Sequence, residues 1–347
     1  MAGHRHLSDF VKQWSLEGRL PIGATPESDE TFEDILKQIE FMIEHAYSRY
    51  VPAMYSHHAP VFQDRMVDWM HNPGLSDEDR VAFFQLVLRF AYFSFDDFIS
   101  LYRTAYSNPI SRWVWEQTGL SMCDADFSAQ LENERSSKTW YASVTDSLII
   151  SEFYHANSIT GIKCRPNFLT LKELGDPSQV KNYINSHGFE RIVLLEDFVG
   201  TGLQCLDVIK WALANLNVPI LFCPMLICPD GFKRVTELAA NSAGRLKIDP
   251  VVKLGDSVFL STFEKSDAVM NYVSDMAARI HSRVAGTSTV GAPPYTPHGF
   301  HLPGDSHTGA TVVMFSNTPD NTIPLVHFNS DKSDWVPVFP RVSRETP

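Results

Sequence analysis

The chain has 347 residues, of which 44% are hydrophobic and 20% are charged, and its formal net charge is −12. This length allows two domains of ordinary size, and the composition is typical of a globular protein. The acidic balance argues against a broad nucleic-acid-binding surface, although a local basic patch stays compatible with it. The N-terminus shows no apolar signal segment and no run approaches the length of a membrane span, so we expect a soluble cytoplasmic protein.

The five cysteines do not have the spacing of a zinc site. Their number is odd, and no pair has C-x-x-C spacing. They are Cys123, Cys164, Cys205, Cys223 and Cys228. The pattern therefore predicts buried free thiols in a reducing compartment.

Residues 30 to about 120 have a helical pattern. Ser76 and Asp79 have the spacing of a capping box and predict the start of a helix. Asn108 before Pro109 predicts an N-cap followed by proline at the first helical position. An earlier segment carries an apolar stripe at helical spacing. The stripe consists of Phe32, Ile35, Leu36, Ile39, Ile43 and Ala46.

This helical half contains no catalytic constellation. It could serve as an interaction platform for a protein or ribonucleoprotein partner if its aromatic residues were exposed. The candidates are Phe83, Phe84, Tyr92 and Phe95, most of which we expect in the core. His57 and His58 are expected at the surface or at an interface.

From about residue 138 onward, short apolar runs alternate with helical segments. Alternating strands and helices predict an α/β fold with a mostly parallel sheet flanked by helices. We expect this sheet in a domain at residues 126–347, after an N-terminal all-helical region at residues 1–125, and such sheets bind ligands at the carboxyl ends of their strands. The predicted strands are 140–144, 192–195, 220–227, 258–261 and 311–315, and the predicted helices are 148–156, 203–216, 231–240 and 266–284.

Residues 285–309 are rich in Gly, Pro, Ser and Thr and contain His298, His301 and His307. The spacing of these histidines matches no helical pair of metal ligands. The segment is expected to be a long surface loop, either a lid that excludes water or a mobile loop with incidental histidines.

The strongest local pattern is the segment 191–204. Its apolar run ends in Glu196 and Asp197, and the turn Gly200-Thr201-Gly202 follows before a helical segment. Carboxylates at the carboxyl end of a strand can accept hydrogen bonds from ribose hydroxyls or hold Mg²⁺ directly or through water. Glycines let a ligand approach the main chain, and the N-terminus of the next helix favours a phosphate. The segment predicts a site for a ribose 5-phosphate; alternatively, its acids cap the helix.

This pattern resembles the ribose-phosphate-binding motif of the phosphoribosyltransferase superfamily. The resemblance implies that Glu196 and Asp197 act on the ribose and that the loop binds the 5-phosphate. The loop consists of Val199, Gly200, Thr201, Gly202, Leu203 and Gln204. Many members have Thr or Ser where this chain has Gln204, which puts one phosphate contact in question. In the superfamily an early strand-to-helix loop binds pyrophosphate, and Asp146 and Ser147 are its positional candidates here; capping of the next helix is the alternative.

Two outlying segments extend the resemblance: Thr145–Ser147, and Asn317–Leu325 with Trp335 and Phe339–Arg341 downstream. The second of them looks like the C-terminal part of a divergent branch of the superfamily in bacterial conflict systems, which includes effectors encoded beside retron reverse transcriptases. The resemblance implies an antiviral effector that acts on nucleotides or RNA, or senses them. Lys163 and Arg165 could neutralise a polyphosphate or be solvated surface charges, and Arg341 could pair with a ligand phosphate or with a carboxylate.

The resemblance implies an enzyme that uses phosphoribosyl pyrophosphate with Mg²⁺, or a related nucleotide, and reacts at the anomeric carbon of the ribose. The alternative is a nucleotide-sensing or regulatory subunit that keeps the pocket without turnover. The acceptor has no readable code in the sequence.

Overall fold

The computed structural model describes residues 6–27, 30–52, 61–160, 176–260, 267–285, 295–296, 299–300, 309–329 and 334–342. The chain forms two compact units, Met1–Phe95 with Asp256–Pro347, and Asp96–Gly255. The boundary expected at residues 125 and 126 falls inside the second unit, and the division into 1–125 and 126–347 stays a prediction. Several residues singled out in the sequence lie outside the described residues, namely His57, His58, Lys163, Cys164, Arg165, His298, His301 and His307.

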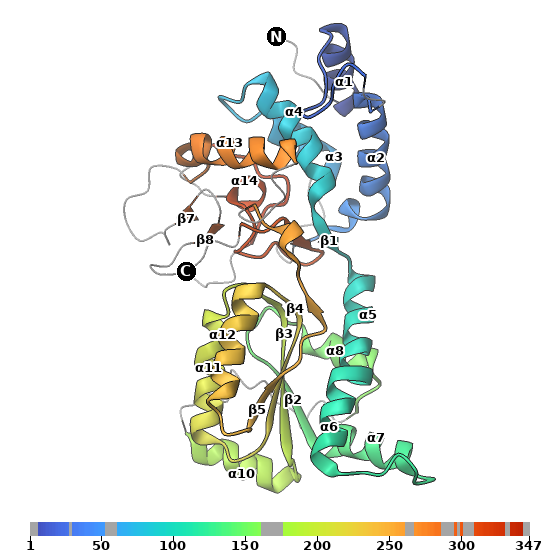
Figure 1. Cartoon of the computed structure of the whole chain (residues 1–347), viewed down its shortest axis with the longest axis vertical. Coiled ribbons are helices and arrows are strands. Elements are labelled where there is room, and N and C mark those ends of the chain that lie inside the picture. The colour runs from blue at the N-terminus through green and yellow to red at the C-terminus, as the bar shows by residue number, and fades with distance from the viewer. Residues whose placement is uncertain are drawn as a thin grey trace. The chain divides into compact units, whose positions relative to one another are not determined.

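The first unit is mainly helical and contains two small pairs of strands (Figure 1). Strand β1 (Ala91–Phe93) pairs in parallel with β9 (Val312–Met314), and β7 (Tyr295–Thr296) pairs antiparallel with β8 (Gly299–Phe300). The helices and helical turns are α1 (Leu7–Leu16), α2 (Phe32–His45), η1 (Tyr47–Arg49), α3 (Phe62–Met70), α4 (Asp77–Leu86), η2 (Val87–Arg89), η5 (Asp256–Val258), α13 (Ala268–Ala285) and α14 (Pro324–His327).

The local signals read from this region mostly hold. The apolar stripe of α2 packs into the core, with Phe32, Ile35 and Ile39 buried. The predicted capping box of α4 is confirmed: Asp79 N donates to Ser76 Oγ at 3.1 Å, and Ser76 N donates to the Asp79 carboxylate at 2.9 Å. Most of the four aromatic residues considered for a partner surface are not exposed. Phe83 and Phe84 are buried and Tyr92 is half-buried, whereas Phe95 is exposed.

The second unit contains a parallel sheet in the order β2-β3-β4-β5, and β6 also pairs with β4. Its strands are β2 (Thr139–Ser143), β3 (Arg191–Val199), β4 (Ile220–Ile227), β5 (Leu246–Ile248) and β6 (Val252–Lys253). Its helices are α5 (Phe95–Ala105), the π-helical turn η3 (Tyr106–Ile110), α6 (Ser111–Thr118), α7 (Phe127–Ser137), α8 (Ile150–Ala156), α10 (Pro177–His187), α11 (Leu203–Asn215) and α12 (Pro229–Ala240). The predicted α/β class with a mostly parallel sheet is confirmed.

Helices cover both faces of this sheet, as a parallel sheet requires. Alternate residues of β3 point to opposite faces, so Ile192 and Leu194 pack with α10, α11 and α12. On the other face, the ring of Tyr141 in β2 lies 5.3 Å from the ring of Phe153 in α8. Figure 1 shows α10–α12 on one side of the sheet and α5, α6 and α8 on the other.

Two local predictions were wrong. Pro109 does not begin a helix: it lies inside η3, and the helical path continues from α5 into α6. Because proline has no N–H, the helix widens at this point, and Ser111 Oγ donates to Tyr106 O at 2.6 Å. The strand expected at residues 258–261 is, in its described part, the end of η5 followed by a single bridge from Phe259 to Ala310.

The remaining strand predictions are confirmed within a few residues, but they do not share one sheet. The segment expected at 311–315 is β9, which pairs with β1 in the first unit. None of the described helices has the length and apolar character needed to cross a membrane.

A buried histidine should make the first unit sensitive to acid. His327 is 1% exposed and its Nε2 donates to Thr322 O at 2.9 Å. Burial, followed by the charge of Arg341, lowers the pKa of His327 from 6.5 to about 3. Below pH 6.5 the imidazole of His327 is therefore protonated in the unfolded chain and stays neutral in the folded chain. The free energy of unfolding consequently falls as the pH drops from 6.5 toward 3.

We predict that His327→Gln flattens the dependence of melting temperature on pH between pH 7.5 and 5. The wild type should lose up to about 1.4 kcal/mol per pH unit through this residue below its unfolded pKa, and the variant should lack this component. Thermal unfolding across the pH range measures it. Parallel curves for the two proteins would contradict the assignment.

Candidate functional site

The site lies at the carboxyl end of β3, which extends beyond the end of the neighbouring strand β2. The last residue of β2, Ser143, pairs with Leu195, and Val144 N donates to Leu195 O at 2.9 Å. The chain then leaves the sheet as the loop Val144–Ile149, before α8. Glu196 and Asp197 therefore meet this loop in place of a neighbouring strand.

Two hydroxyl groups of the loop contact the acidic pair. Thr145 N donates to Glu196 Oε2 at 2.9 Å, and Thr145 Oγ1 donates to Glu196 Oε1 at 2.5 Å. Ser147 Oγ lies 2.8 Å from Glu196 Oε1 and 2.7 Å from Asp197 Oδ1. The two hydroxyl oxygens are 2.7 Å apart. The structure thus joins the predicted acidic pair to Ser147 of the predicted pyrophosphate loop, although their roles toward a ligand stay predictions.

The acidic pair is buried, and this controls its protonation. Glu196 is 2% exposed and Asp197 is 5% exposed. Burial, followed by the negative charge of Asp197, raises the pKa of Glu196 well above its ordinary value, against the hydrogen bonds from Thr145 and Ser147. The two hydroxyls also have only two hydrogens for four short oxygen–oxygen distances. A proton on Glu196 supplies a third donor and relieves the repulsion between the acids.

The charge of the pair extends to both helical layers. Burial raises the pKa of the Cys205 thiol in α11, and the charge of Glu196 adds to this effect. Burial likewise raises the pKa of Tyr102 in α5, and there the charge of Asp197 comes before that of Glu196. Consecutive strand residues direct their side chains to opposite faces, yet both carboxyl groups reach the hydroxyl of Ser147.

The turn after the acids forms the N-terminus of α11. Gly202 is the N-cap and has a φ of 82°, a conformation that glycine adopts without strain. No side chain caps this helix, and the first helical N–H to reach a carbonyl here is that of Leu206, which donates to Gly202 O at 3.0 Å. The preceding N–H groups and the positive end of the helix dipole suit a phosphate.

A second helix packs directly against this turn. Cys228 N donates to Val199 O at 2.8 Å, and α12 begins at the next residue. A Cβ added to Gly231 would lie 2.6 Å from Gly200 O, and one added to Gly202 would lie 3.2 Å from Gly231 Cα. The turn therefore lies on a surface that only a glycine at position 231 allows. This contact was missed in the sequence, where Gly231 was only the first residue of an expected helix.

The predicted loop residues differ in exposure. Val199, Gly200 and Gly202 are buried, while Gln204 is exposed. Thr201 and Leu203 are half-buried. The loop backbone is thus packed against the start of α12. Gln204 stands where many members of the phosphoribosyltransferase superfamily, which this loop resembles, have a hydroxyl residue.

Several alternatives left open by the sequence are now decided. Helix capping is wrong for Ser147, since α8 begins after Ile149 without a side-chain cap and Ser147 contacts the acids. Asp146 is exposed. Arg341 pairs with a carboxylate, because its Nη1 lies 2.5 Å from Asp320 Oδ1. The described cysteines are free thiols, with Cys123 exposed and the other three buried.

The acidic pair has the donor atoms that Mg²⁺ prefers. Within the described ranges, no group of three or more His, Cys, Asp or Glu side chains could hold a metal ion. This does not conflict with Mg²⁺, which usually takes one or two carboxylates and completes its shell with water and substrate phosphates. Asp197 would supply such an oxygen, and Glu196 would do so after it loses its proton.

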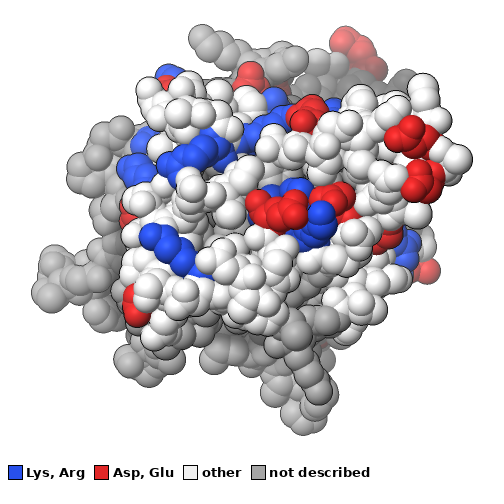
Figure 2. Space-filling model, turned by 90° about the horizontal axis from the view of Figure 1, so that it is seen from below, with Lys and Arg blue, Asp and Glu red and all other residues white. Residues whose placement is uncertain are grey.

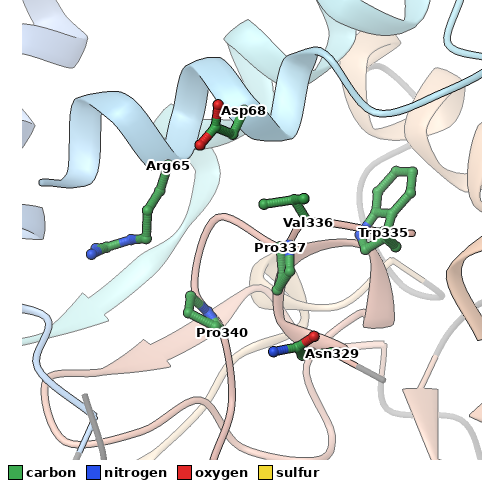
Figure 3. A pocket seen from close by; sticks show the side chains of 7 residues that line it. All are labelled: Arg65, Asp68, Asn329, Trp335, Val336, Pro337 and Pro340. Atoms are coloured by element: carbon green, nitrogen blue, oxygen red, sulfur yellow. The ribbon is translucent and has the colours of Figure 1, made fainter. Parts of the chain in front are cut away.

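The first unit has a cavity of about 240 Å³ that contains no pair of adjacent acids and no glycine turn (Figure 3). Its arginine, Arg65, is buried, donates from Nε to Val338 O at 3.0 Å, and holds its guanidinium 5.5 Å from the ring centroid of Phe62. These contacts assign Arg65 to the core. The cavity is lined by Arg65, Asp68, Asn329, Trp335, Val336, Pro337 and Pro340.

Figure 2 shows one face of the molecule on which Lys and Arg residues are interspersed with Asp and Glu residues. Several of the ion pairs of the second unit involve the start of β3: Arg191 lies 2.8 Å from Glu134, and Lys138 lies 3.2 Å from Glu190. Pairing of this kind neutralises basic groups locally. The absence of a broad nucleic-acid-binding surface stays a prediction.

Gly231→Ala tests the packing of the turn. The added methyl group would approach Gly200 O at 2.6 Å, so either α12 or the turn must shift. We expect a loss of about 1–3 kcal/mol in stability, measured by thermal or chemical unfolding. Gly255→Ala is the matched control, because no atom lies within 4 Å of its added Cβ. Equal losses in both variants would contradict the proposed contact.

Glu196→Gln tests the burial of the acid. A carboxyl group whose pKa is raised in the folded state contributes stability below its unfolded pKa of 4.5 and loses it as the pH rises through the folded pKa. The amide carries no charge and can still exchange hydrogen bonds with Thr145 and Ser147. The melting temperature of the variant should therefore exceed that of the wild type increasingly from pH 5 to pH 8. A gap that does not change with pH would argue against a strained acid.

Comparison with known proteins completes this description. No curated protein and no solved structure matches the chain. A family model described as PRTase-CE matches residues 66–341, a segment that includes the acidic pair, the glycine turn and the loop after β2. Since this match spans well over half of the sequence, the chain belongs to the PRTase-CE family, a phosphoribosyltransferase-like family.

Proposed function

We propose that the chain binds phosphoribosyl pyrophosphate, or a related nucleotide, at the carboxyl end of β3 and transfers or cleaves at the anomeric carbon of the ribose. The observation that carries this proposal is the placement of two buried carboxyl groups directly before an uncapped helix N-terminus. Carboxylate oxygens suit vicinal ribose hydroxyls, and helix N–H groups suit a 5-phosphate. The membership of a phosphoribosyltransferase-like family supports the same ligand.

The distribution of residues suggests how the parts of the ligand would lie. The backbone of Val199–Gln204 would hold the 5-phosphate, with Thr201 as an additional hydroxyl donor. The acidic pair would lie near the ribose, and the loop that contains Asp146 and Ser147 would lie on the side of the pyrophosphate. A bound magnesium ion would neutralise the pyrophosphate as it leaves.

The chemistry asks for charge stabilisation and positioning. Loss of pyrophosphate leaves positive charge on the anomeric carbon, and the negative field of the buried acids stabilises such charge more strongly than the same acids in water. A fixed phosphate and a fixed ribose also hold the reacting carbon in place. We further propose that this activity serves antiviral defence, on the resemblance to effectors of bacterial conflict systems.

A non-catalytic sensor or regulatory subunit is the second candidate. It is favoured by Gln204, which is exposed where many superfamily members have a Thr or Ser. It is also favoured by Ser147, whose hydroxyl is engaged with the acids at 2.7 and 2.8 Å. Such a protein would bind the ligand and not release pyrophosphate.

Asp197→Ala should abolish pyrophosphate release and weaken ligand binding by at least tenfold, since a carboxylate that accepts hydrogen bonds from a ligand contributes about 1.5–3 kcal/mol. Asp207→Ala, at an exposed position of α11, is the matched control. Calorimetric titration with phosphoribosyl pyrophosphate and Mg²⁺ measures binding, and a coupled assay measures pyrophosphate.

The two measurements also separate the candidates. Binding with pyrophosphate release supports the enzyme, and binding without release supports the sensor. Mass spectrometry of nucleotides and RNA from cells that express the wild type or Asp197→Ala would show which acceptor is modified. Turnover at the wild-type rate in Asp197→Ala would overturn the enzymatic proposal.

A further inference from the structure

One buried tyrosine near the acidic pair differs from the others in its hydrogen bonding. Six of the described tyrosines are buried, and the hydroxyl groups of five of them donate to an acceptor. The donors and acceptors are Tyr47 with Val87 O, Tyr50 with Pro340 O, Tyr106 with Glu132 Oε1, Tyr141 with Arg135 O, and Tyr154 with Tyr141 O, at 2.6–3.0 Å. The sixth, Tyr102, is 4% exposed, and its hydroxyl makes no hydrogen bond with any residue that the structure describes.

The isolated hydroxyl of Tyr102 needs an explanation. A buried hydroxyl that makes no hydrogen bond lowers stability, because it has given up its bonds to water. Native proteins contain few such groups, and those that occur are often found where a protein has a functional role for them. Phenylalanine at this position would make the same ring contacts without this cost. The hydroxyl is therefore best explained by a partner that is not part of the chain.

The ring of Tyr102 is held in place from two helices. Its centroid lies 6.0 Å from that of Phe98 in α5 and 6.0 Å from that of Phe153 in α8. The main chain is fixed as well, since Asn157 Nδ2 donates to Tyr102 O at 3.2 Å and to Phe153 O at 2.9 Å. These contacts fix the direction in which the hydroxyl points, without a bond to the hydroxyl itself.

The hydroxyl of Tyr102 lies in the field of the acidic pair. Burial, followed by the negative charges of Asp197, Glu152 and Glu196, raises the pKa of Tyr102 well above its ordinary value. The phenol therefore keeps its proton in the physiological range and can act as a hydrogen-bond donor. It is near three carboxyl groups and donates to none of them.

The position of Tyr102 in the second unit indicates which part of a ligand it would meet. Its neighbour α8 directly follows the loop Val144–Ile149, which contacts the acidic pair. Figure 1 shows α5 and α8 on the opposite side of the sheet from α11, whose N-terminus suits a phosphate. A ligand with its 5-phosphate at α11 would therefore approach Tyr102 with its other end.

We propose that Tyr102 is a further binding residue of the site, whose hydroxyl donates a hydrogen bond to an oxygen of the ligand in the part that lies away from the 5-phosphate. In phosphoribosyl pyrophosphate this part is the pyrophosphate group. The assignment rests on the proposed function. The sequence carried no signal for it, because α5 precedes every strand of this sheet and lies far from the acidic pair along the chain.

The first experiment needs no ligand and compares Tyr102→Phe with Tyr154→Phe by thermal unfolding. Tyr154 is the matched control, because it is also buried but its hydroxyl donates to Tyr141 O at 2.7 Å. We expect Tyr102→Phe to melt at the wild-type temperature or slightly above it, and Tyr154→Phe to melt about 2–4 °C lower. Equal losses in the two variants would show that the hydroxyl of Tyr102 is paired in the folded protein and would overturn the inference.

The second experiment measures affinity by calorimetry, with Mg²⁺ and either phosphoribosyl pyrophosphate or ribose 5-phosphate. Tyr102→Phe should raise the Kd for phosphoribosyl pyrophosphate about five- to tenfold, the effect of one lost hydrogen bond, and that for ribose 5-phosphate less than about twofold. Tyr154→Phe should change neither Kd by more than about twofold. An unchanged Kd for phosphoribosyl pyrophosphate in Tyr102→Phe would overturn the contact, and equal losses for the two compounds would overturn its place away from the 5-phosphate.

The outcomes also separate this inference from the proposed function. A wild type that binds neither compound refutes the proposed function and, with it, the ligand contact of Tyr102. A wild type that binds phosphoribosyl pyrophosphate no more tightly than Tyr102→Phe refutes the contact alone. The comparison of melting temperatures decides in either case whether the hydroxyl lacks a partner in the folded protein.

Discussion

The burial of two neighbouring carboxyl groups is the constraint on which the rest of the second unit depends. Glu196 and Asp197 are almost inaccessible, and two charges in such a place repel each other and lose their hydration. The structure compensates with hydroxyl groups and a main-chain N–H from the loop after β2, and by a raised pKa that keeps a proton on Glu196 near neutral pH. A core strand with apolar residues at these positions would be more stable, so the acids are best explained by a ligand.

The glycine turn next to the acids is also arranged in a way that suits a ligand. Gly202 and Gly231 allow the turn before α11 and the start of α12 to approach each other closely. This close approach leaves a helix N-terminus at the carboxyl end of the sheet, the place where open α/β sheets bind ligands. Buried charge and uncapped helix N–H groups both cost stability, and the ligand that we propose, with hydroxyls next to a phosphate, would pair with both.

The sequence predicted what is local. The strand at 192–195, the acids after it, the glycine turn and the next helix are adjacent in the chain, so apolar runs, turn residues and helical spacing were sufficient to predict them. The strand is longer than predicted, because β3 continues through both acids to Val199. Contacts across the chain were not readable. Thr145 lies 51 residues from Glu196, and their hydrogen bond depends on the register that pairs Ser143 with Leu195. A shift of that register by one residue would reverse which side chains face the acids.

The errors have the same origin. Asn108-Pro109 has the local chemistry of a helix start, yet packing of Tyr106 and Ile110 in the core carries the helix through the proline as a π-helical turn. Likewise, the strand at 312–314 was correct as a strand, but its partner, β1, lies more than two hundred residues earlier in the sequence. Local patterns identify an element; its partner is chosen by the burial of surfaces that only the folded chain brings together.

The position of Pro224 in a central strand shows how tertiary context overrides a local rule in favour of the site. Proline is rare inside sheets because it cannot donate to the ladder. Here Pro224 pairs with Glu196, and on its other side β4 passes from β5 to β6, where Pro224 O accepts from Val251 N at 3.0 Å. The missing donor therefore falls at the break between two short edge strands, where no ladder bond is lost. The neighbours of β3 and β4 both end near this point: β2 ends opposite Leu195, and β5 ends opposite Phe222, before Pro224. The end of β2 gives the acids a loop to bind instead of a strand.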